Sequence, residues 1–295
     1  MAEPSKLHLY ERKGAYIPRV AAVHDLCGYG KCSLGVAIPV LSAAGCDVCP
    51  VPTGLFSSHT AFPGWYMHDT TEMISDYLAA WKNIGVEIDA IYSGFLGAPE
   101  QVDRIRDLYA MYPKALRVVD PVMADHGKVY PTYTPELCDA MAELVAGADV
   151  LTPNLTEAAI ILGEPIGDEW AGTDISNAEA HRLVDALVAK GAKHVVLKGI
   201  QREGETLIRN FVGGVDCDTV EVSNEYLPYM LHGTGDVYAS CLLAAIMAGR
   251  SLREAVEFAG SFTHDAMIVS AKQPGYQDRG VSFEPLLGKV AALLG

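Results

Sequence analysis

The chain has 295 residues, 50% of them hydrophobic, with 22 basic and 37 acidic side chains and a formal net charge of −15. A chain of this size can bury a large core, as one α/β domain or as two. The negative charge argues against nucleic acid or an anionic membrane surface as a partner, so any phosphate must be bound by local groups.

The sequence shows no secretion signal and no stretch of the roughly 20 apolar residues that span a membrane. Its seven cysteines are an odd number, which is typical of reduced thiols rather than of a disulfide framework. We therefore expect a globular, cytoplasmic protein.

Strand and helix patterns alternate along the first half of the chain, after a polar arm that covers residues 1–18. Short apolar runs predict buried strands, and longer runs with helical spacing, ended by glycine or opened by proline, predict helices. In chain order we predict a strand at 19–24, a Gly-rich loop at 25–33, a helix at 33–44, a strand at 46–52, a polar and aromatic loop at 53–65, a helix at 70–84, a strand at 90–92, a loop at 93–97, a helix at 99–112 and a strand at 116–119.

The same alternation continues in the second half. In chain order we predict an irregular segment at 120–130, a helix at 135–146, a strand at 149–151, a loop at 152–157 that opens a helix through Leu162, a strand at 194–197, a hairpin of 207–211 with 219–222, a helix at 237–248, and a helix opened by a capping box from Ser251 to Glu254. No repeat or linker interrupts the pattern, so we predict one domain over 1–295. Such alternation favours a mostly parallel sheet with helices on both faces, which binds ligands outside the carboxyl ends of its strands.

The segment 228–250 carries the most informative motif. Gly233, Thr234 and Gly235 precede Asp236 and an apolar run typical of a buried helix. The glycines let the backbone approach an anion, and the N–H groups and dipole at a helix start favour negative charge. A carboxylate here would repel phosphate, but it could take a proton from an attacking hydroxyl. A tight turn with Asp236 as helix cap remains the alternative from this motif alone.

Two nucleotide-binding motifs fail on inspection. The phosphate-binding loop of nucleoside triphosphatases would need glycine at Asp25 and serine or threonine at Cys32. The dinucleotide fingerprint lacks its third glycine, which is Ser33 here.

Four cysteines with ligand-like spacing resemble a zinc set. A core helix separates them and apolar residues surround the second pair, so we expect buried thiols instead. These cysteines are Cys27, Cys32, Cys46 and Cys49.

The remaining polar residues match the needs of phosphoryl transfer to a hydroxyl, namely a base, a metal and donors for the moving charge. Asp236 is the candidate base. Asp120, Asn154 and Glu157 are oxygen ligands suited to Mg²⁺ and its waters, and Lys198 can neutralise a phosphate. A helix cap is the alternative for Asn154 and Glu157, although it explains neither Asp120 nor Asp236.

Five stretches in a fixed order now indicate a family. They are FSSHT (56–60), SGFLG (93–97), DPVMAD (120–125), TPNLTE (152–157) and HGTGD (232–236). With this set the chain resembles the pyridoxal/pyridoxamine kinases of the ribokinase-like superfamily, over residues from about 20 to 275. The resemblance implies a three-layer α/β sandwich in a homodimer. It also implies ATP-dependent phosphorylation of the 5′-hydroxymethyl group of a vitamin B6 vitamer with Mg²⁺ and with Asp236 as base, and it leaves open whether a monovalent cation takes part.

The resemblance further implies a pyridine pocket, which also shows where this chain departs from its relatives. Many relatives have serine-histidine after the first strand and tyrosine in the loop at 93–97, whereas this chain has Val23-His24-Asp25 and Phe95. The His24-Asp25 pair partly resembles the sequence at this position in the hydroxymethylpyrimidine kinases of thiamin synthesis. Such a kinase therefore remains an alternative function, and a non-catalytic carrier of pyridoxal 5′-phosphate is another. The implied pocket residues are His24, Asp25, Phe56, His59, Thr60 and Phe95.

Asp25 has two interpretations. Phe95 can pack against a pyridine but cannot donate a hydrogen bond to it, so polar selection must come from another residue. The carboxylate of Asp25 could pair with the amine of pyridoxamine or with a protonated ring nitrogen. Alternatively, it caps the helix that starts near Ser33 or braces the glycine loop.

Overall fold

The computed structural model describes residues 3–166, 175–215 and 217–295. Its main sheet has nine strands, and a separate hairpin pairs β6 (Ala124–Asp125) with β7 (Lys128–Val129). The strands of the main sheet are β1 (Arg19–Cys27), β2 (Asp47–Phe56), β3 (Met67–Asp69), β4 (Ala90–Ser93), β5 (Leu116–Val119), β8 (Val150–Leu151), β9 (His194–Gln201), β10 (Leu207–Gly214) and β11 (Cys217–Glu225).

The strand order is β11-β10-β9-β8-β5-β4-β1-β2-β3. The block from β2 to β9 in this order is parallel throughout. β3 and β10 run antiparallel to the edges of that block, and β11 extends β10 as the predicted hairpin. The mostly parallel sheet is therefore confirmed, with its strand ends gathered at a common edge.

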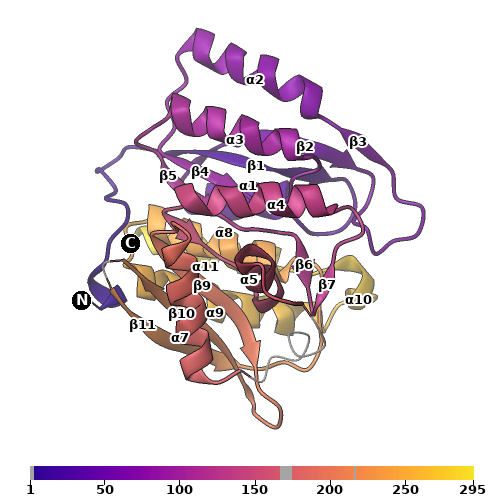
Figure 1. Ribbon diagram of the computed structural model, residues 1–295, viewed down its shortest axis with the longest axis vertical. Coiled ribbons are helices and arrows are strands. Elements are labelled where there is room, and N and C mark those ends of the chain that lie inside the picture. Colours follow the sequence, from indigo (N-terminus) through magenta and orange to yellow (C-terminus); the bar gives the residue numbers. More distant parts are fainter. Residues whose placement is uncertain (1–2, 167–174, 216) are drawn as a thin grey trace.

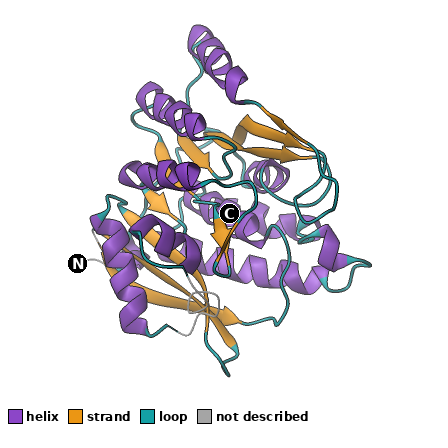
Figure 2. Cartoon of the chain, turned by 45° about the vertical axis from the view of Figure 1, so that its right-hand side comes forward, coloured by secondary structure: helices purple, strands orange, loops and turns teal. Residues whose placement is uncertain are grey.

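Helices cover both faces of the sheet, which makes three layers (Figure 1 and Figure 2). The α-helices are α1 (Leu34–Ala43), α2 (Thr71–Ile84), α3 (Pro99–Met111), α4 (Pro135–Leu144), α5 (Leu155–Leu162), α7 (Asn177–Ala189), α8 (Thr234–Met247), α9 (Leu252–Ser270), α10 (Tyr276–Arg279) and α11 (Leu287–Ala291), and the 3₁₀ turns are Pro4–Lys6, Val145–Gly147, Glu284–Leu286 and Ala292–Leu294. α2, α3, α4, α5 and α7 pack on one face, and α1, α8, α9 and α11 pack on the other.

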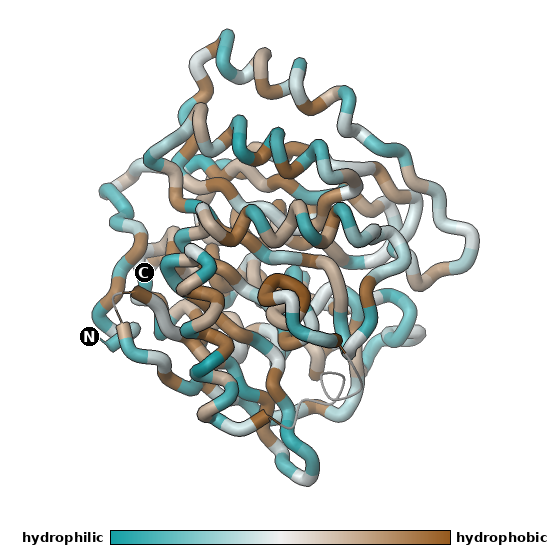
Figure 3. The backbone as a smooth tube through the Cα atoms, viewed as in Figure 1, coloured by the Kyte–Doolittle hydropathy of each residue, from teal (hydrophilic) through white to brown (hydrophobic). Residues whose placement is uncertain are grey.

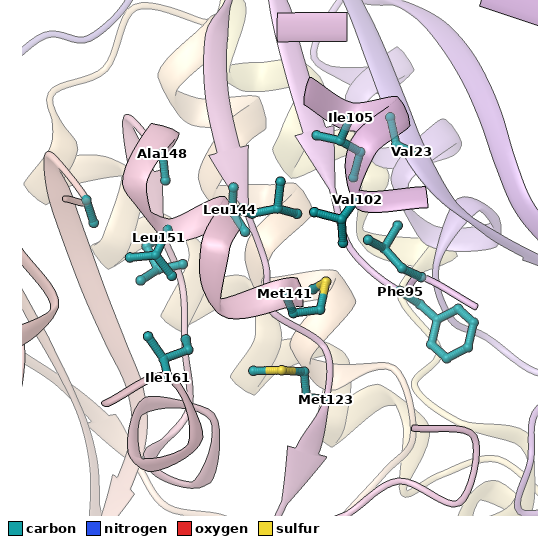
Figure 4. Packing of buried hydrophobic residues seen from close by; sticks show 14 of the residues in the cluster. Val23, Phe95, Val102, Ile105, Met123, Met141, Leu144, Ala148, Leu151 and Ile161 are labelled. Atoms are coloured by element: carbon teal, nitrogen blue, oxygen red, sulfur yellow. The ribbon is translucent and has the colours of Figure 1, made fainter. Parts of the chain in front are cut away.

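The apolar run of β1 explains its central place. Val20 and Ala22 pack into the cluster that contains α8, whereas Ala21 and Val23 pack into the opposite cluster. Successive side chains of a strand point to opposite faces, so a strand covered on both sides must be apolar at every position. Figure 3 shows the apolar residues concentrated on the inner strands and inner helix faces, and Figure 4 shows Val23 in the cluster with Phe95.

Several elements differ from the sequence-based prediction. β1 and β2 continue to Cys27 and Phe56, so Asp25 lies in a strand rather than in a loop. The backbones of β1 and β2 stay paired beyond a register shift between His24 and Leu26. The paired segment includes polar residues, so a search for apolar runs ends the predicted strand too early. The edge strand β3, the hairpin β6-β7 and the short helices α10 and α11 are too brief for a periodic signal, and the longer α7 was also not predicted.

The N-terminal arm packs onto the body over its described part. The carbonyl of Leu7 accepts from Leu252 N, and Arg12 donates to the carbonyls of Ala44 and Gly45, both at 2.9 Å. These contacts tie the arm to the C-terminal end of α1 and to the start of α9. Within the described residues, no helix is long and apolar enough to cross a membrane.

Leu242 tests the layered core, because it is 0% exposed in α8 beneath the sheet. We expect Leu242→Ala to lower the free energy of unfolding by about 2–5 kcal/mol, through lost apolar burial and the cavity left behind. Chemical denaturation measures this change. Leu207→Ala is the matched control, because Leu207 is 37% exposed on β10 and its truncation should cost far less. Equal losses in the two variants would contradict this packing.

Candidate active site

The start of α8 is a candidate anion site at the carboxyl edge of the sheet. Gly233 has φ +82°, and a Cβ there would lie 1.8 Å from the carbonyl oxygen of Lys31, so only glycine fits. The first-turn N–H groups of α8 have no intrahelical acceptor and point toward this edge. A Cβ at Gly235 would lie 3.8 Å from the Lys198 ammonium, which places a positive charge beside these amides. The predicted arrangement of glycines and cation therefore exists in the fold.

Asp236 occupies the first turn of α8 next to this site. Its carboxylate accepts a hydrogen bond from the backbone N–H of Ser33, which belongs to the loop after β1. Burial, and next the charge of Asp120, raise the pKa of Asp236 to about 7. A carboxylate with a pKa near neutrality is suited to accept and release a proton, which a helix cap does not require.

Lys198 and Asp120 form an ion pair under the same edge. Lys198 Nζ lies 2.5 Å from Asp120 Oδ1, and the Thr152 hydroxyl donates to the same oxygen at 2.8 Å. Asp120 is 1% exposed. Burial opposes the charge on Lys198, but Asp120, Glu157 and Asp236 together raise the pKa of this lysine. Lys198 is therefore held as a cation beside acidic groups from three segments of the chain.

Asn154 and Glu157 form the capping box of α5. Asn154 Oδ1 accepts from Glu157 N at 2.9 Å, and Glu157 Oε2 accepts from Asn154 N at 2.8 Å. Asn154 also donates to the Ala124 carbonyl, and Glu157 Oε1 accepts from Met123 N at 3.3 Å. The alternative of a helix cap is thus confirmed for both residues, and the box also anchors the segment after β5.

Glu157 is nevertheless unusual for a cap. It is 2% exposed, and burial raises the pKa of Glu157 to about 8, while the charge of Lys198 opposes this rise. The positive charge of Lys198 interacts with both the Glu157 and the Asp120 carboxyl groups. Both roles can coexist, because a carboxylate has lone pairs beyond those that the backbone amides use.

Aromatic rings from three segments form one wall beside the edge. Phe56 and Phe95 meet edge to face at 5.6 Å, and Trp65 and Tyr133 extend the group at 5.7 Å from Phe56 and from Phe95 respectively. The Tyr133 hydroxyl accepts from Leu96 N at 3.3 Å. Sequence reasoning identified Phe56 and Phe95 but missed Trp65 and Tyr133, which lie outside the five motifs.

His59 is held between loops. Its Nε2 lies 2.9 Å from the Asp278 carbonyl oxygen, and its ring stacks on His232 at 4.6 Å and on Phe62 at 4.5 Å. A Cβ on Gly30 would lie 2.1 Å from the His59 ring. Thr60, the next predicted pocket residue, is exposed. His59 therefore joins the loop after β2 to α10 and to the residue before the Gly233 turn.

His24 and Asp25 lie on opposite faces near the end of β1. His24 is 0% exposed against the Tyr92 ring at 4.2 Å, and burial lowers the pKa of His24 to about 3, so the imidazole is neutral. Asp25 is 6% exposed, and its carboxylate accepts from the Ser33 side chain. Burial raises the pKa of Asp25 to about 6. The bracing role considered for Asp25 is therefore present in the structure.

Comparison with known proteins places this geometry in a family. The sequence profile of the family named phosphomethylpyrimidine kinase matches residues 38–281. The chain belongs to this family. A pyridoxal kinase of Haemophilus influenzae (strain PittEE) is 33% identical over 236 residues, covering 72% of this chain and 75% of the relative.

Solved structures agree with this assignment. A structure assigned as a phosphomethylpyrimidine kinase of Bacteroides thetaiotaomicron VPI-5482, crystallised with pyridoxal, is 33% identical with a TM-score of 0.87, covering 93% of this chain and 96% of that one. The pyridoxal kinase of Lactobacillus plantarum is 27% identical with a TM-score of 0.85, covering 94% and 98%. The resemblance inferred from the five motifs and the ribokinase-like α/β fold are confirmed.

The four cysteines of the possible zinc set lie too far apart to bind one ion. The strands β1 and β2 are parallel, and their register places Cys49 opposite Ala21 and Cys27 opposite Phe56. Cys46 and Cys49 are therefore near the amino edge and Cys27 and Cys32 near the carboxyl edge, roughly 20 Å away at about 3.3 Å per residue.

The carboxylates near Lys198 suit magnesium only with other ligands. Across residues 3–166, 175–215 and 217–295, no group of three or more His, Cys, Asp or Glu side chains is placed to hold a metal. Mg²⁺ usually keeps several waters and takes one or two protein carboxylates together with phosphate oxygens. Asp120 and Glu157 fit that partial role.

The raised pKa of Asp236 gives a testable pH dependence of stability. Because the fold favours its neutral form, the stability that Asp236 contributes is present at low pH and is lost as pH rises from about 4 toward 7. We expect Asp236→Asn to unfold at a higher temperature than the parent protein at pH 8, with a smaller difference at pH 4.5. Circular dichroism melts measure both values.

Asp76→Asn serves as the control, because Asp76 is exposed on α2. It should change the unfolding temperature little at either pH. An Asp236→Asn effect of the same size at pH 4.5 and pH 8 would show that Asp236 ionises as it does in the unfolded chain.

Proposed function

We propose that this protein is a vitamin B6 kinase, which transfers the γ-phosphate of ATP to the 5′-hydroxymethyl group of pyridoxal, pyridoxamine or pyridoxine. The observation that carries the proposal is Asp236, a carboxylate with a pKa of about 7 at the N-terminus of α8, beside the Lys198 cation. Family membership and the relatives named pyridoxal kinase support the same reaction.

In the mechanism that this geometry supports, Asp236 accepts the proton of the 5′-hydroxyl as its oxygen attacks the γ-phosphorus. The amides of the Gly233–Asp236 turn and the α8 dipole stabilise the charge on the transferred group, with Thr234 at the first helical position. Lys198 adds a cation beside Gly235. Asp120 keeps Lys198 charged and oriented through their 2.5 Å contact.

Mg²⁺ is the proposed metal for this reaction. Asp120 and Glu157 would hold it through water at the edge where Lys198 lies, together with the capping residue Asn154. Bound there, the ion would neutralise charge on the phosphates of ATP.

The proposed vitamer pocket lies against the aromatic wall. Phe56 and Phe95 supply flat apolar surface for a pyridine ring, with His59 and Thr60 on the following loop. His24 supports the proposed pocket from below. Its buried ring packs against Gly94, where a Cβ would lie only 2.1 Å from the ring. Asp25 is the proposed charged group at this end of β1.

The proposal also covers the domain organisation, the cellular location and the oligomeric state. We propose a single kinase domain over 1–295, which the continuous nine-stranded sheet supports. A cytoplasmic location is consistent with free thiols such as Cys27 and Cys46. A homodimer is proposed on the family resemblance.

Phosphorylation of hydroxymethylpyrimidine is the second candidate, favoured by the name of the matching family. Both substrates present a hydroxymethyl group on a nitrogen heterocycle, so the same base and anion site would serve each. Incubation with ATP and each alcohol, followed by detection of the phosphate ester by mass spectrometry, separates the two. Turnover of the pyrimidine alone would overturn the B6 assignment, and turnover of none would favour a carrier protein.

The base is tested by Asp236→Asn, which keeps the shape of the α8 turn but cannot accept the proton. We expect turnover to fall by roughly 10²–10⁴, as is typical of general-base catalysis, while ATP still binds. Steady-state kinetics and a direct ATP-binding measurement report the two effects separately. Near-normal turnover would reduce Asp236 to a helix cap.

Asp25 is tested by two substitutions with different losses. Asp25→Asn removes the charge but keeps an acceptor for the Ser33 hydroxyl, whereas Asp25→Ala removes both. If the carboxylate pairs with the amine of pyridoxamine, both variants should lower the ratio of pyridoxamine to pyridoxal activity by at least about tenfold, equivalent to ~1.4 kcal/mol. If Asp25 only braces Ser33, the ratio stays constant and Asp25→Ala alone loses activity and thermal stability.

A further inference from the structure

Two cysteines flank the glycine loop next to the proposed base. Cys27 ends β1 and Cys32 lies two residues before α1, and both are free thiols. Their side chains are within hydrogen-bonding distance of each other, and Cys27 Sγ also lies 3.1 Å from the Tyr29 carbonyl oxygen. Cys27 is 7% exposed, and Cys32 is partly exposed at the loop surface. The two thiols are thus neighbours, and both keep some exposed surface, of which Cys27 has the smaller share.

The environment of Cys27 differs from that of the other thiols near the sheet. The hydrogen bond from Cys32 lowers the pKa of Cys27 despite its burial, and a thiolate is the reactive form of cysteine. Burial instead raises the pKa of Cys46 to about 11, and it also raises the pKa of Cys138 and Cys241. In this neighbouring pair, the second thiol favours the thiolate of the first.

The loop between the two cysteines contacts the anion site directly. A Cβ on Gly233 would lie 1.8 Å from the carbonyl oxygen of Lys31, so the two backbones are in close contact. Ser33 donates its backbone N–H to the Asp236 carboxylate. Lys31 Nζ in turn contacts Glu284 at 2.5 Å, which ties the same loop to the C-terminal segment. A change in the backbone between Cys27 and Ser33 would therefore move groups that position Gly233 and Asp236.

We propose that Cys27 and Cys32 are a redox modification site, at which a hydroperoxide forms a reversible disulfide that switches off phosphoryl transfer. With hydrogen peroxide, the Cys27 thiolate attacks the O–O bond, which gives Cys27 sulfenic acid and, after protonation of the leaving hydroxide, one water. The Cys32 thiol then attacks the Cys27 sulfur and displaces a second water. Two thiols are oxidised to a disulfide while one peroxide is reduced to two waters.

The disulfide would fix the conformation of the glycine loop. A disulfide requires Cα atoms about 4.4–6.8 Å apart and a Cβ–S–S–Cβ angle near 90°. Closing the ring from Cys27 to Cys32 would constrain the four residues between them, including Gly30, which packs against His59, and Lys31, which packs against Gly233. The loss of activity rests on the proposed function, whereas formation of the disulfide does not.

The experiment treats the full chain with hydrogen peroxide and follows two readouts. Intact mass should fall by two hydrogens, and trypsin, which cuts after Lys31, should yield two peptides joined through Cys27 and Cys32. B6 kinase activity should fall at least tenfold and return after dithiothreitol. Cys27→Ser and Cys32→Ser should fold and retain activity without peroxide, and both should resist inactivation.

Cys46→Ser and Cys138→Ser are matched controls, which should lose activity with peroxide as the parent protein does. A joined peptide pair in a protein without activity on any candidate alcohol would support the modification site and reject the proposed function. Failure to form the 27–32 linkage, or equal inactivation of Cys32→Ser, would overturn the redox proposal. If both serine variants fail to fold, peptide mapping of the parent protein still decides whether the linkage forms.

Discussion

The carboxyl edge of the sheet depends on one buried cation and the carboxylates that surround it. Lys198 reaches Asp120 at 2.5 Å, and its pKa is raised by Asp120, Glu157 and Asp236 against the effect of burial. Each of these carboxylates would be costly to bury alone, because desolvation penalises the charged form. The shared cation offsets part of that cost. The outcome is a set of groups of which two, Asp236 and Glu157, titrate near neutral pH.

Close backbone approach holds the loops around this cluster. Gly233 lies against the Lys31 carbonyl, and Gly280, with φ +79°, leaves room for the carbonyl of His232 at 2.9 Å from a would-be Cβ. The backbone N–H of Val281 donates to that same carbonyl at 3.0 Å. Side chains at these glycines would push the loop after β1, the turn before α8 and the C-terminal segment apart. The positions of the proposed base and anion site therefore depend on backbone contacts made at glycines.

The family name and the names of the relatives describe two related reactions. A phosphomethylpyrimidine kinase profile covers most of the chain, while the Haemophilus influenzae and Lactobacillus plantarum relatives are pyridoxal kinases. Both reactions act on a substituted methyl group of a nitrogen heterocycle, so the proposed base Asp236 and the Lys198 cation do not by themselves distinguish the two substrates. We therefore expect discrimination at the proposed ring pocket, where Phe95 is apolar and where Asp25 and Tyr133 supply polar atoms.

The sequence by itself determined the elements whose signal is local. The apolar run of β1, the capping boxes at Asn154 and Ser251, and the glycine turn ahead of α8 follow from side-chain periodicity and helix-end chemistry within a few residues. For the same reason the motifs were sufficient to recognise the family and to nominate Asp236.

Only the tertiary structure decided which distant residues meet. His59 bonds to the Asp278 carbonyl 219 residues away, Tyr133 joins the wall of Phe95, and Asp25 lies within a strand because β1 pairs with β2 beyond its apolar run. The possible zinc set fails for a related reason, since parallel strands place Cys46 and Cys27 at opposite edges. Periodicity reports which face of an element is buried, but loop conformation and strand register depend on partners that no local pattern encodes.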